Sequence, residues 1–354
     1  MKSVKLLHLI FITIISLACG SCSASADLDQ DYQIAYAATD GTAGLFRNIY
    51  VTKLDGSEPI NLTEGFEISE EGEPIWSPDG TKIAYIKSSF SSKEDIYVMN
   101  ANGTEQTNVT NHPARDWYPS WSADGSQIAF ISNRENDIWQ IFVVNVDGSK
   151  LQQLTFGEDE SWNATWSPDG TQIVFEWKWE LATMNSDGSN IRQLTNDNSS
   201  YKSPSNPAWS PDGTEIAFIA RVDDSELNSW SQIFVINADG SHLRQLTQGK
   251  NSPNRPIWSP DGSQIAFTVN ENHQHLATDI YVMNADGSNV IQLINDGNWN
   301  DNPVWSTDGK KIAYEVVNLV TESNMDIFIM NADGSNQTLL IENAGYDGQP
   351  SWRH

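Results

Sequence analysis

Residues 206–247 read NPAWSPDGTEIAFIARVDDSELNSWSQIFVINADGSHLRQLT, and four segments of this stretch have the composition of β-strands. They are NPAWS, TEIAFIA, SQIFVIN and LRQLT, in which β-branched and aromatic residues dominate, and Gly, Pro, Asn and Asp cluster between them. Four short strands joined by turns predict one antiparallel sheet. The second and third segments are apolar on both sides, so we expect this sheet to be buried on both faces.

The same unit recurs along the chain. Its tryptophan, followed in most copies by SPDG or a close variant, returns every 43 to 49 residues. These repeat tryptophans are Trp76, Trp121, Trp166, Trp209, Trp258, Trp305 and Trp352. A period of this size with four strands in each unit is typical of β-propeller blades. One equivalent tryptophan in every unit indicates packing between blades rather than a ligand site.

The two ends of the chain together complete one blade. Residues 31–63 supply a second, third and fourth strand without a preceding tryptophan strand, and residues 349–352 supply a lone first strand. We therefore predict that residues 31–354 form an all-β domain, a seven-bladed β-propeller of four-stranded antiparallel blades. The C-terminal strand is expected to close the ring by joining the N-terminal blade, which removes two open sheet edges.

The consensus PxWSPDGxxIAF…DIYVMNADGSNxxQLT resembles the TolB-type, WD-like propeller repeat of bacterial envelope proteins, over residues 31–352. The resemblance implies the fold but not one function, because the same repeat occurs in TolB, in propellers attached to oligopeptidases and in free-standing exported proteins. The sequence shows neither the α/β domain that precedes the TolB propeller nor a GxSxG motif, and it has more blades than TolB. Neither TolB's partners nor a peptidase triad is therefore carried over.

The SPDG and NADGS segments are predicted to be hairpin turns. In SPDG, the φ angle of Pro is already set for a turn, and Gly can adopt the left-handed conformation that follows. The alternative is a metal site at the repeated aspartates, but a calcium loop needs several carboxylates and each turn offers one. The aspartates in question are Asp79, Asp124, Asp169, Asp212, Asp261 and Asp308. We predict no metal site and no cofactor.

Residues 1–18 have the features of a secretory signal peptide. Lys2 and Lys5 precede an apolar run that ends at Ala18. This run is too short to span a bilayer, which needs about 20 residues, but it suits the apolar region of a signal. We therefore expect the protein to be exported.

Two cleavage sites can be recognised after this run. The segment SLAC, ending at Cys19, resembles a bacterial lipobox, so we expect cleavage before Cys19 and lipidation of this residue. The alternative is cleavage after residue 26, at the segment ASA. With cleavage before Cys19, residues 19–30 would form a flexible linker. The expected location is the periplasm or the cell surface, with the membrane contacted only through the lipid anchor.

Charge and cysteine content exclude other classes of function. The formal net charge is −27, and so acidic a chain repels phosphate backbones, so nucleic acid is excluded as a partner. Cys19 and Cys22 are the only cysteines. The propeller therefore has no disulfide and no thiol chemistry. We also expect the protein to be a monomer.

The two repeated turns of each blade fall on one face of the propeller. The opposite face, here called the irregular face, is built from the loops between second and third strands and the loops between blades, which vary in length and composition. Binding and catalytic groups concentrate in such loops. Seven tryptophans outside the repeat map to this face: Trp117, Trp139, Trp162, Trp177, Trp179, Trp230 and Trp299. Most belong to neighbouring units, so we expect them to cluster on one side.

The segment EWKWE, residues 176–180, is the shortest connection between a second and a third strand. A short blade between longer ones should leave a notch, with Trp177 and Trp179 at its rim. Trp139 and Trp179 each stand one residue before the third strand in adjacent units. Exposed indoles near carboxylates suit stacking on sugar rings or anchoring a protein partner. The alternative is that these indoles pack the loops onto the blades.

Asp116 and Glu160 join the seven tryptophans as candidate ligand-binding residues. Further carboxylates expected on the same face are Glu71, Glu158, Asp159, Asp223, Asp224, Glu226 and Asp301. A pair of them could act as acid and base in glycoside cleavage, but the sequence does not give the separation that this chemistry requires. His273 and His275 form a single HxH without a third ligand, so no zinc site is predicted.

These features predict a non-enzymatic exported propeller that binds a protein or a polysaccharide of the bacterial cell envelope through its irregular face. No catalytic residue is assigned, because the repeat accounts for residues 31–352 and no catalytic constellation is recognised. The alternative is a carbohydrate-active hydrolase or lyase that uses the carboxylates of that face.

Overall fold

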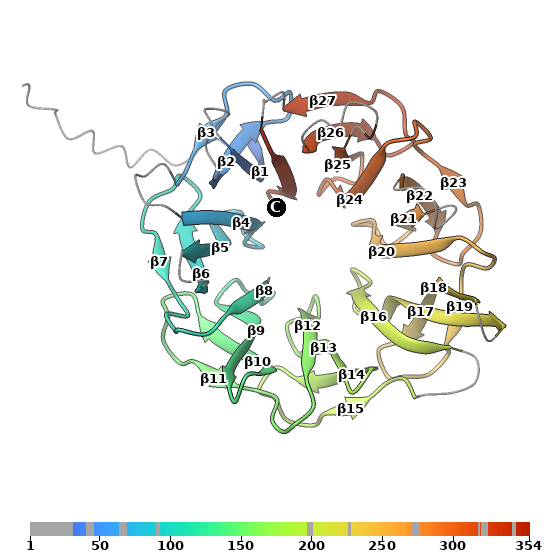
Figure 1. Ribbon diagram of the computed structural model, residues 1–354, viewed down its shortest axis with the longest axis horizontal. Helices are drawn as coiled ribbons and strands as arrows, with labels where there is room; N and C mark the ends of the chain where they lie inside the picture. Colours follow the sequence, from blue (N-terminus) through green and yellow to red (C-terminus); the bar gives the residue numbers. More distant parts are fainter. Residues whose placement is uncertain are drawn as a thin grey trace, which may run out of the picture.

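The computed structural model describes residues 31–39, 46–63, 69–89, 93–196, 201–225, 228–270, 277–317, 319, 325–341 and 345–354. In this part of the chain, seven four-stranded antiparallel sheets surround a central opening (Figure 1). The predicted all-β, seven-bladed propeller is therefore confirmed. The predicted signal peptide, the linker and Cys19 lie outside the described residues. No helix long and apolar enough to span a membrane occurs within the described ranges.

Each blade runs from its first strand beside the central opening to its fourth strand at the rim (Figure 1). Blade 1 consists of β28 (Asp347–Trp352), β1 (Tyr32–Thr39), β2 (Arg47–Lys53) and β3 (Ile60–Asn61). Blade 2 consists of β4 (Ser69–Trp76), β5 (Lys82–Ser89), β6 (Glu94–Asn100) and β7 (Thr107–Asn108). Blade 3 consists of β8 (Asp116–Trp121), β9 (Gln127–Glu135), β10 (Ile138–Asn145) and β11 (Gln152–Gln153).

The remaining four blades follow the same order. Blade 4 consists of β12 (Ser161–Trp166), β13 (Gln172–Trp177), β14 (Glu180–Asn185) and β15 (Arg192–Gln193). Blade 5 consists of β16 (Lys202–Trp209), β17 (Glu215–Ser225), β18 (Asn228–Asn237) and β19 (Arg244–Gln245). Blade 6 consists of β20 (Ser252–Trp258), β21 (Gln264–Asn270), β22 (Asp279–Asn284) and β23 (Ile291–Gln292). Blade 7 consists of β24 (Trp299–Trp305), β25 (Lys311–Val317), β26 (Met325–Asn331) and β27 (Thr338–Ile341).

The C-terminal strand closes the ring, as predicted. β28 pairs antiparallel with β1, with Trp352 opposite Ile34 and Asp347 opposite Ala38. One further backbone hydrogen bond, of 2.7 Å, runs from the Arg353 N–H to the carbonyl of Gln33. The first and last strands of the chain thus occupy one sheet, in which β28 covers the edge of β1 that would otherwise be open.

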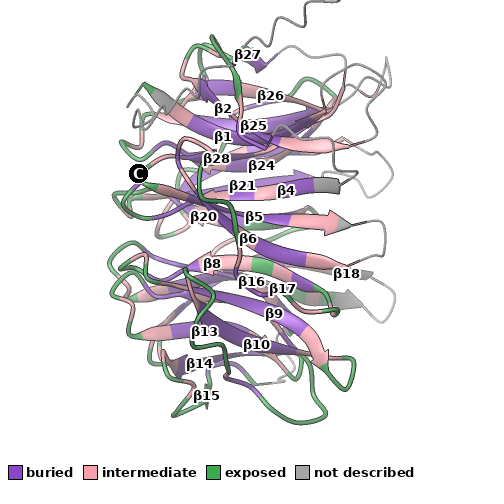
Figure 2. Ribbon diagram, turned by 90° about the vertical axis from the view of Figure 1, so that its left-hand side faces the viewer, coloured by how far each residue is buried: buried purple, intermediate pink, exposed green. Residues whose placement is uncertain are grey.

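The hydrophobic core lies between blades rather than within one of them. Ile131 and Ile141 of blade 3, for example, pack in one cluster with Phe175 and Met184 of blade 4. Corresponding clusters join the other blades, so the middle strands are buried on both faces, and Figure 2 shows the buried segments running along them. This packing explains why the second and third segments of each unit are apolar on both sides.

The repeat tryptophans connect neighbouring blades. In five of the seven, the indole N–H donates to a carbonyl in the first strand of the preceding blade, as from Trp209 to Thr165 (3.1 Å) and from Trp258 to Ala208 (3.1 Å), whereas the indole N–H groups of Trp76 and Trp166 have no such partner. The same bond is made by Trp121, Trp305 and Trp352. The repeat tryptophans are also buried against the hydrophobic clusters. The prediction that these residues pack blade against blade is confirmed.

The SPDG segments are turns, as predicted. In blade 5, the Asp212 carboxylate accepts hydrogen bonds from the Ser210 hydroxyl (2.6 Å) and from the Thr214 N–H (3.0 Å). Gly213 has a φ of +70°, in the left-handed region that glycine adopts without strain. The hydrogen bonds from Ser210 and Thr214 lower the pKa of Asp212. The repeated aspartate thus holds its own turn together.

Replacing Asp212 by Ala tests the role of this carboxylate. The variant should lose about 1 kcal/mol of unfolding free energy and about 2 °C in Tm, because the turn loses its acceptor. Since the pKa of Asp212 is lowered in the folded state, its contribution is complete above the ordinary value of 3.8 and is lost as pH falls through the folded value. Calorimetry should show the Tm difference shrinking below about pH 4. A difference that stays constant to lower pH would contradict this role.

Candidate functional site

Three of the non-repeat tryptophans form a ladder on the irregular face. The rings of Trp117 and Trp139 are stacked with centroids 4.5 Å apart, and those of Trp139 and Trp162 lie 5.1 Å apart at a tilt. Together with Trp177, these half-buried side chains pack against the cluster between blades 3 and 4. The predicted clustering is therefore present for these four. Much of the indole surface in the ladder is occupied by the neighbouring indole, and the three tryptophans lie in β8, β10 and β12 rather than in loops, so the ladder packs blade 3 against blade 4.

Carboxylates fix the two ends of the ladder. The indole N–H of Trp117 donates to Glu94 Oε2 (2.6 Å), and that of Trp162 donates to Glu160 Oε2 (3.2 Å). The Arg115 guanidinium lies over the ring of Trp117, 5.7 Å from its centroid. These contacts hold the two indoles in defined orientations. Glu160, one of the predicted site residues, therefore lies directly beside Trp162.

Trp179 differs from the other tryptophans in both exposure and backbone conformation. It is 84% exposed and forms, with Lys178, the two-residue turn between β13 and β14. Lys178 and Trp179 have φ angles of +56° and +65°. Turns of this type favour Asn and Gly, because a side chain at positive φ is strained. Packing within the blade does not explain a tryptophan at this position.

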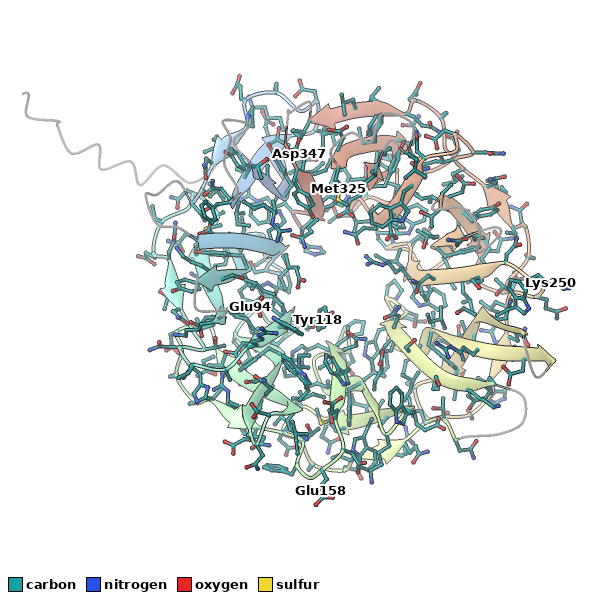
Figure 3. The ribbon with its side chains drawn as sticks, in the orientation of Figure 1. Glu94, Tyr118, Glu158, Lys250, Met325 and Asp347 are labelled. Carbon is teal, nitrogen blue, oxygen red and sulfur yellow. The ribbon has the colours of Figure 1, made fainter. Side chains whose placement is uncertain are left out.

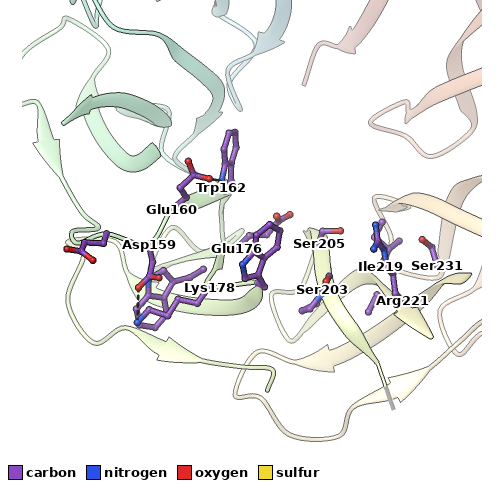
Figure 4. Close-up of a pocket in the computed structure, with 15 residues that line it drawn as sticks. Asp159, Glu160, Trp162, Glu176, Lys178, Ser203, Ser205, Ile219, Arg221 and Ser231 are labelled. Carbon is purple, nitrogen blue, oxygen red and sulfur yellow. Dashed lines mark hydrogen bonds and ion pairs between the residues drawn. The ribbon is translucent and has the colours of Figure 1, made fainter. Parts of the chain in front are cut away.

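The expected notch is present between blades 4 and 5. β13 and β14 have 6 residues each, whereas β17 and β18 have 11 and 10. A cavity of about 490 Å³ opens beside the shorter blade (Figure 4). We call it the notch site; it is lined by Glu158, Asp159, Glu160, Trp162, Glu176, Trp177, Lys178 and Trp179 on one side and by Ser203, Pro204, Ser205, Ile219, Ala220, Arg221 and Ser231 on the other. Its volume suits a small ligand or a short segment of a polymer.

The notch site combines aromatic, acidic and hydroxyl groups. Lys178 pairs with Asp159 (3.0 Å) and lies over the ring of Trp177, 4.4 Å from its centroid. One face of Trp177 is therefore covered by a cation. Trp179 and the edge of Trp162 remain at the cavity wall, opposite the hydroxyls of Ser203 and Ser205. The site thus offers an indole surface on one wall and hydrogen-bonding groups on the other.

Glu176 is the most buried acid of the notch site. Its Oε1 accepts hydrogen bonds from the side-chain amide of Asn163 (2.7 Å) and the N–H of Asn206 (2.8 Å), while burial raises its pKa. Glu315 has the same arrangement in blade 7: its Oε1 accepts from the side-chain amide of Asn302 (3.1 Å) and from the N–H of Gln349 (2.6 Å), and burial raises its pKa too. Each acid therefore connects the first strands of two neighbouring blades.

The other predicted site residues lie elsewhere. Asp116 is fully buried, and Arg134 Nη2 donates to both of its carboxylate oxygens at 2.9 and 3.0 Å, so it forms an internal ion pair. Trp230 lies in β18 next to Ser231, but successive residues of a strand point to opposite faces, and only Ser231 lines the cavity. Trp299 begins β24 of blade 7, where it bridges to Thr278.

Further carboxylates expected on the irregular face also have partners within the protein. Glu71 is buried, accepts a hydrogen bond from the Thr63 hydroxyl (3.0 Å) and pairs with Lys87 (3.2 Å). Asp223 pairs with Lys202 (2.9 Å). The side chains of Asp224 and Glu226 and both histidines of the HxH segment lie outside what the structure describes. Where side chains are described, no group of three His, Cys, Asp or Glu residues is arranged to hold a metal ion.

Sequence reasoning missed a set of residues that lines the central channel. Each first strand contains a bulge, at which one residue has a φ between +50° and +58° and points into the channel cavities. We call these residues the channel ring: Glu73, Tyr118, Asn163, Asn206, Arg255, Asn302 and Gln349. In six of the seven blades the next residue is Pro, which has no N–H to pair and is tolerated at bulges.

A sequence signal for the channel ring exists. The ring residue always stands three positions before the repeat tryptophan, in a segment whose following residues are nearly identical between units. At this one position the units carry Glu, Tyr, Asn, Arg or Gln. This variation at one fixed position of a regular repeat would have identified the ring residues from the sequence. That they line the channel follows only from the bulge, which the sequence does not show.

The sequence was also compared with known proteins. A family model described as the TolB beta propeller domain matches residues 33–206 and 198–353. No curated protein matches the sequence. The propeller is similar to TolB from Acinetobacter baumannii, with 19% identity and a TM-score of 0.54; the alignment covers 91% of this chain and 66% of the TolB chain.

Two other solved structures, one of a lyase and one of a protease domain, contain a similar propeller. Oligogalacturonate lyase from Vibrio parahaemolyticus has 14% identity and a TM-score of 0.62, with 88% of this chain and 86% of the lyase covered. The β-propeller domain of the Trilobed protease from Pyrococcus furiosus has 12% identity and a TM-score of 0.65, with 88% and 95% covered. At these identities the likeness concerns the fold alone, so the activity must be argued from the site.

Two tryptophan variants separate the packing role of the ladder from the free surface at the notch. Trp139→Ala should lower the free energy of unfolding by about 3 kcal/mol, because it removes the central indole of the ladder and leaves a cavity. Trp179→Ala should change it by less than about 0.5 kcal/mol, because that side chain is exposed. Urea unfolding measures both. Equal losses in the two variants would show that Trp179 is a packing residue.

Proposed function

The chain belongs to the TolB-type β-propeller family, and on that premise we propose that it is an exported, non-enzymatic propeller that binds a polysaccharide of the bacterial cell envelope. The proposed binding site is the notch site between blades 4 and 5. The lipobox-like segment ending at Cys19 motivates the further proposal that a lipid anchor holds the propeller at a membrane surface.

The composition of the notch site supports a sugar ligand. The apolar face of a sugar ring stacks on an exposed indole, and Trp179 offers such a surface at the cavity rim. Sugar hydroxyls both donate and accept hydrogen bonds, and the walls provide carboxylates at Glu158 and Glu160 and hydroxyls at Ser203 and Ser205. A protein partner would be expected to use a broader and flatter surface than a cavity of about 490 Å³.

The single observation that carries the proposal is the conformation of Trp179. A bulky residue in the left-handed region costs about 1 kcal/mol or more, and Trp179 recovers none of it by burial. Positive φ alone does not indicate a function, since exposed Glu105 has it too, but a large exposed indole held in this conformation beside a cavity does. At the rim of a cavity that contains three indoles, that function is contact with a ligand.

The alternative is a hydrolase or lyase, and Glu176 is the observation that favours it. A buried carboxyl with a raised pKa is what a general acid in glycoside cleavage requires. However, Glu315 has the same two hydrogen bonds and the same direction of pKa shift in a blade outside the notch. The joining of neighbouring blades therefore explains both acids, and binding without chemistry is the better-supported proposal.

Replacing Trp179 by Gly tests the proposal. Gly relieves the strain at positive φ, so the variant should be more stable than the wild type by about 1 kcal/mol. Its affinity for a bound oligosaccharide should fall by about tenfold or more, because the stacking surface is lost. Oligosaccharide arrays would identify the ligand, and titration calorimetry would measure its affinity.

A matched control exists in the neighbouring blade. Asp137 has a φ of +59° in the turn between β9 and β10, so Asp137→Gly should relieve the same kind of strain. This variant should gain stability and keep full affinity for the oligosaccharide. Unchanged affinity in Trp179→Gly would refute the notch site. Binding of an envelope protein and of no oligosaccharide would replace the polysaccharide with a protein partner.

A turnover assay separates binding from catalysis. The purified propeller, incubated with the oligosaccharide it binds, should release no shorter product. Glu176→Gln should retain the affinity, because the amide oxygen can still accept from Asn163 and Asn206. Product release by the wild type that is abolished by Glu176→Gln would establish the enzymatic alternative.

A further inference from the structure

The central channel carries opposite charges on opposite walls. Glu73 lies in β4 and Arg255 in β20, and these strands face each other across the central opening (Figure 1). Both residues line the two overlapping channel cavities, of about 610 and 740 Å³. The structure contains no ion pair between them. A ligand within the channel could therefore contact both charges at once.

Glu73 presents a carboxylate that no described residue satisfies. Its backbone N–H donates to Gln349 Oε1 (2.8 Å), which fixes the bulge, but its carboxylate makes no hydrogen bond or ion pair with any described residue. Burial raises the pKa of Glu73, while Arg47 and Arg255 act against this rise. Glu73 is half-buried at the channel wall, so its carboxylate has lost part of its contact with water without gaining a donor from the protein. An ammonium group bound in the channel would supply that donor.

Arg255 presents a guanidinium that is only partly used. Its Nη1 donates to Asn302 Oδ1 (3.3 Å), and its Nε lies 3.7 Å from Asp301 Oδ1. Nη2 makes no hydrogen bond with any described residue, and half of the side chain is exposed. The backbone N–H of Arg255 donates to Asn254 Oδ1 (2.9 Å), which fixes this bulge as well. The free side of the guanidinium suits a carboxylate.

Tyr118 occupies the wall next to Glu73. Figure 3 shows its side chain at the edge of the central opening. Its ring meets that of Trp117 edge-on, with centroids 6.4 Å apart, and its hydroxyl makes no hydrogen bond with any described residue. Tyr118 thus offers an apolar face and a polar tip to whatever lies between the two charges.

The fold does not require these three side chains. All seven ring residues have positive φ, a conformation that Asn tolerates better than most residues. Asn fills the position in blades 4, 5 and 7, whereas Glu, Tyr and Arg fill it in blades 2, 3 and 6. Because these strained positions also face a common cavity, their chemically distinct side chains point to a ligand there rather than to packing.

We propose that the central channel binds a small zwitterion, with its ammonium group on Glu73, its carboxylate on Arg255 and its carbon chain against Tyr118. The ammonium group supplies the donor that Glu73 lacks, and the carboxylate adds to the contacts that Arg255 makes with Asn302 and Asp301. A ligand with one charge would engage only Glu73 or only the free side of Arg255, so it should bind more weakly. This site is separate from the notch site and does not depend on the proposed polysaccharide.

Titration calorimetry with linear amino acids tests the proposal. The probes are aminobutanoate, aminohexanoate and aminooctanoate with terminal amino groups, a series whose lengths sample the separation of the two charges. At least one should bind, and about tenfold more tightly than hexanoate or hexylamine, which each carry one of its two charges. Binding of none of the three, or equal binding of zwitterion and single-charge analogues, would overturn the proposal.

Variants with asparagine keep the bulge while removing the charge. Glu73→Asn and Arg255→Asn introduce the residue that three other blades already have at this position. Each should fold as the wild type does and lower the affinity for the best zwitterion by about tenfold. Glu105→Gln is the matched control, because Glu105 is an exposed acid with a φ of +56° that does not line the channel cavities, and it should change nothing.

Discussion

The seven repeat tryptophans are buried between neighbouring blades, and in five of them the indole N–H also donates a hydrogen bond to the preceding blade. This hydrogen bond joins an indole N–H, as in Trp209, to a carbonyl of the neighbouring first strand, here that of Thr165. The same bond in Trp352 joins the last strand of the chain to blade 7, beside the strand pairing that closes the ring. Because each blade is positioned by its neighbour, the turns and strands that make these contacts hardly vary between units.

Function can then reside only where the units differ. The repeated turns use their aspartates internally, as Asp212 does, so the turn face has little chemistry to offer a ligand. The notch site arises because the hairpin at Lys178 and Trp179 is shorter than those of its neighbours. The channel ring arises because a bulge in each first strand exposes one side chain that the blade contacts do not specify. Both sites are departures from the repeat on a regular scaffold.

The fold could be predicted almost completely from the sequence. The repeat period indicates propeller blades, the turn residues mark the hairpins within each blade, and the two end fragments together complete one blade and so predict how the ring closes. The notch could also be predicted, since the length of EWKWE is visible in the sequence. Side-chain burial could not be predicted: Asp116 stands where the sequence suggests a variable loop, but it begins β8, and Arg134 from the neighbouring strand covers it. The stacking of Trp139 between two other indoles likewise depends on how strands of blades 3 and 4 extend toward the irregular face. The channel ring required the backbone conformation of the bulges.

We propose that ligands bind where the repeat is broken, and a crystal structure of the propeller soaked with its best-bound oligosaccharide would locate the ligand. We expect electron density for a sugar ring stacked on Trp179, with its hydroxyls directed toward Glu160 and Ser203. Density on the turn face, with Trp179 still free in solvent, would refute binding at the notch site.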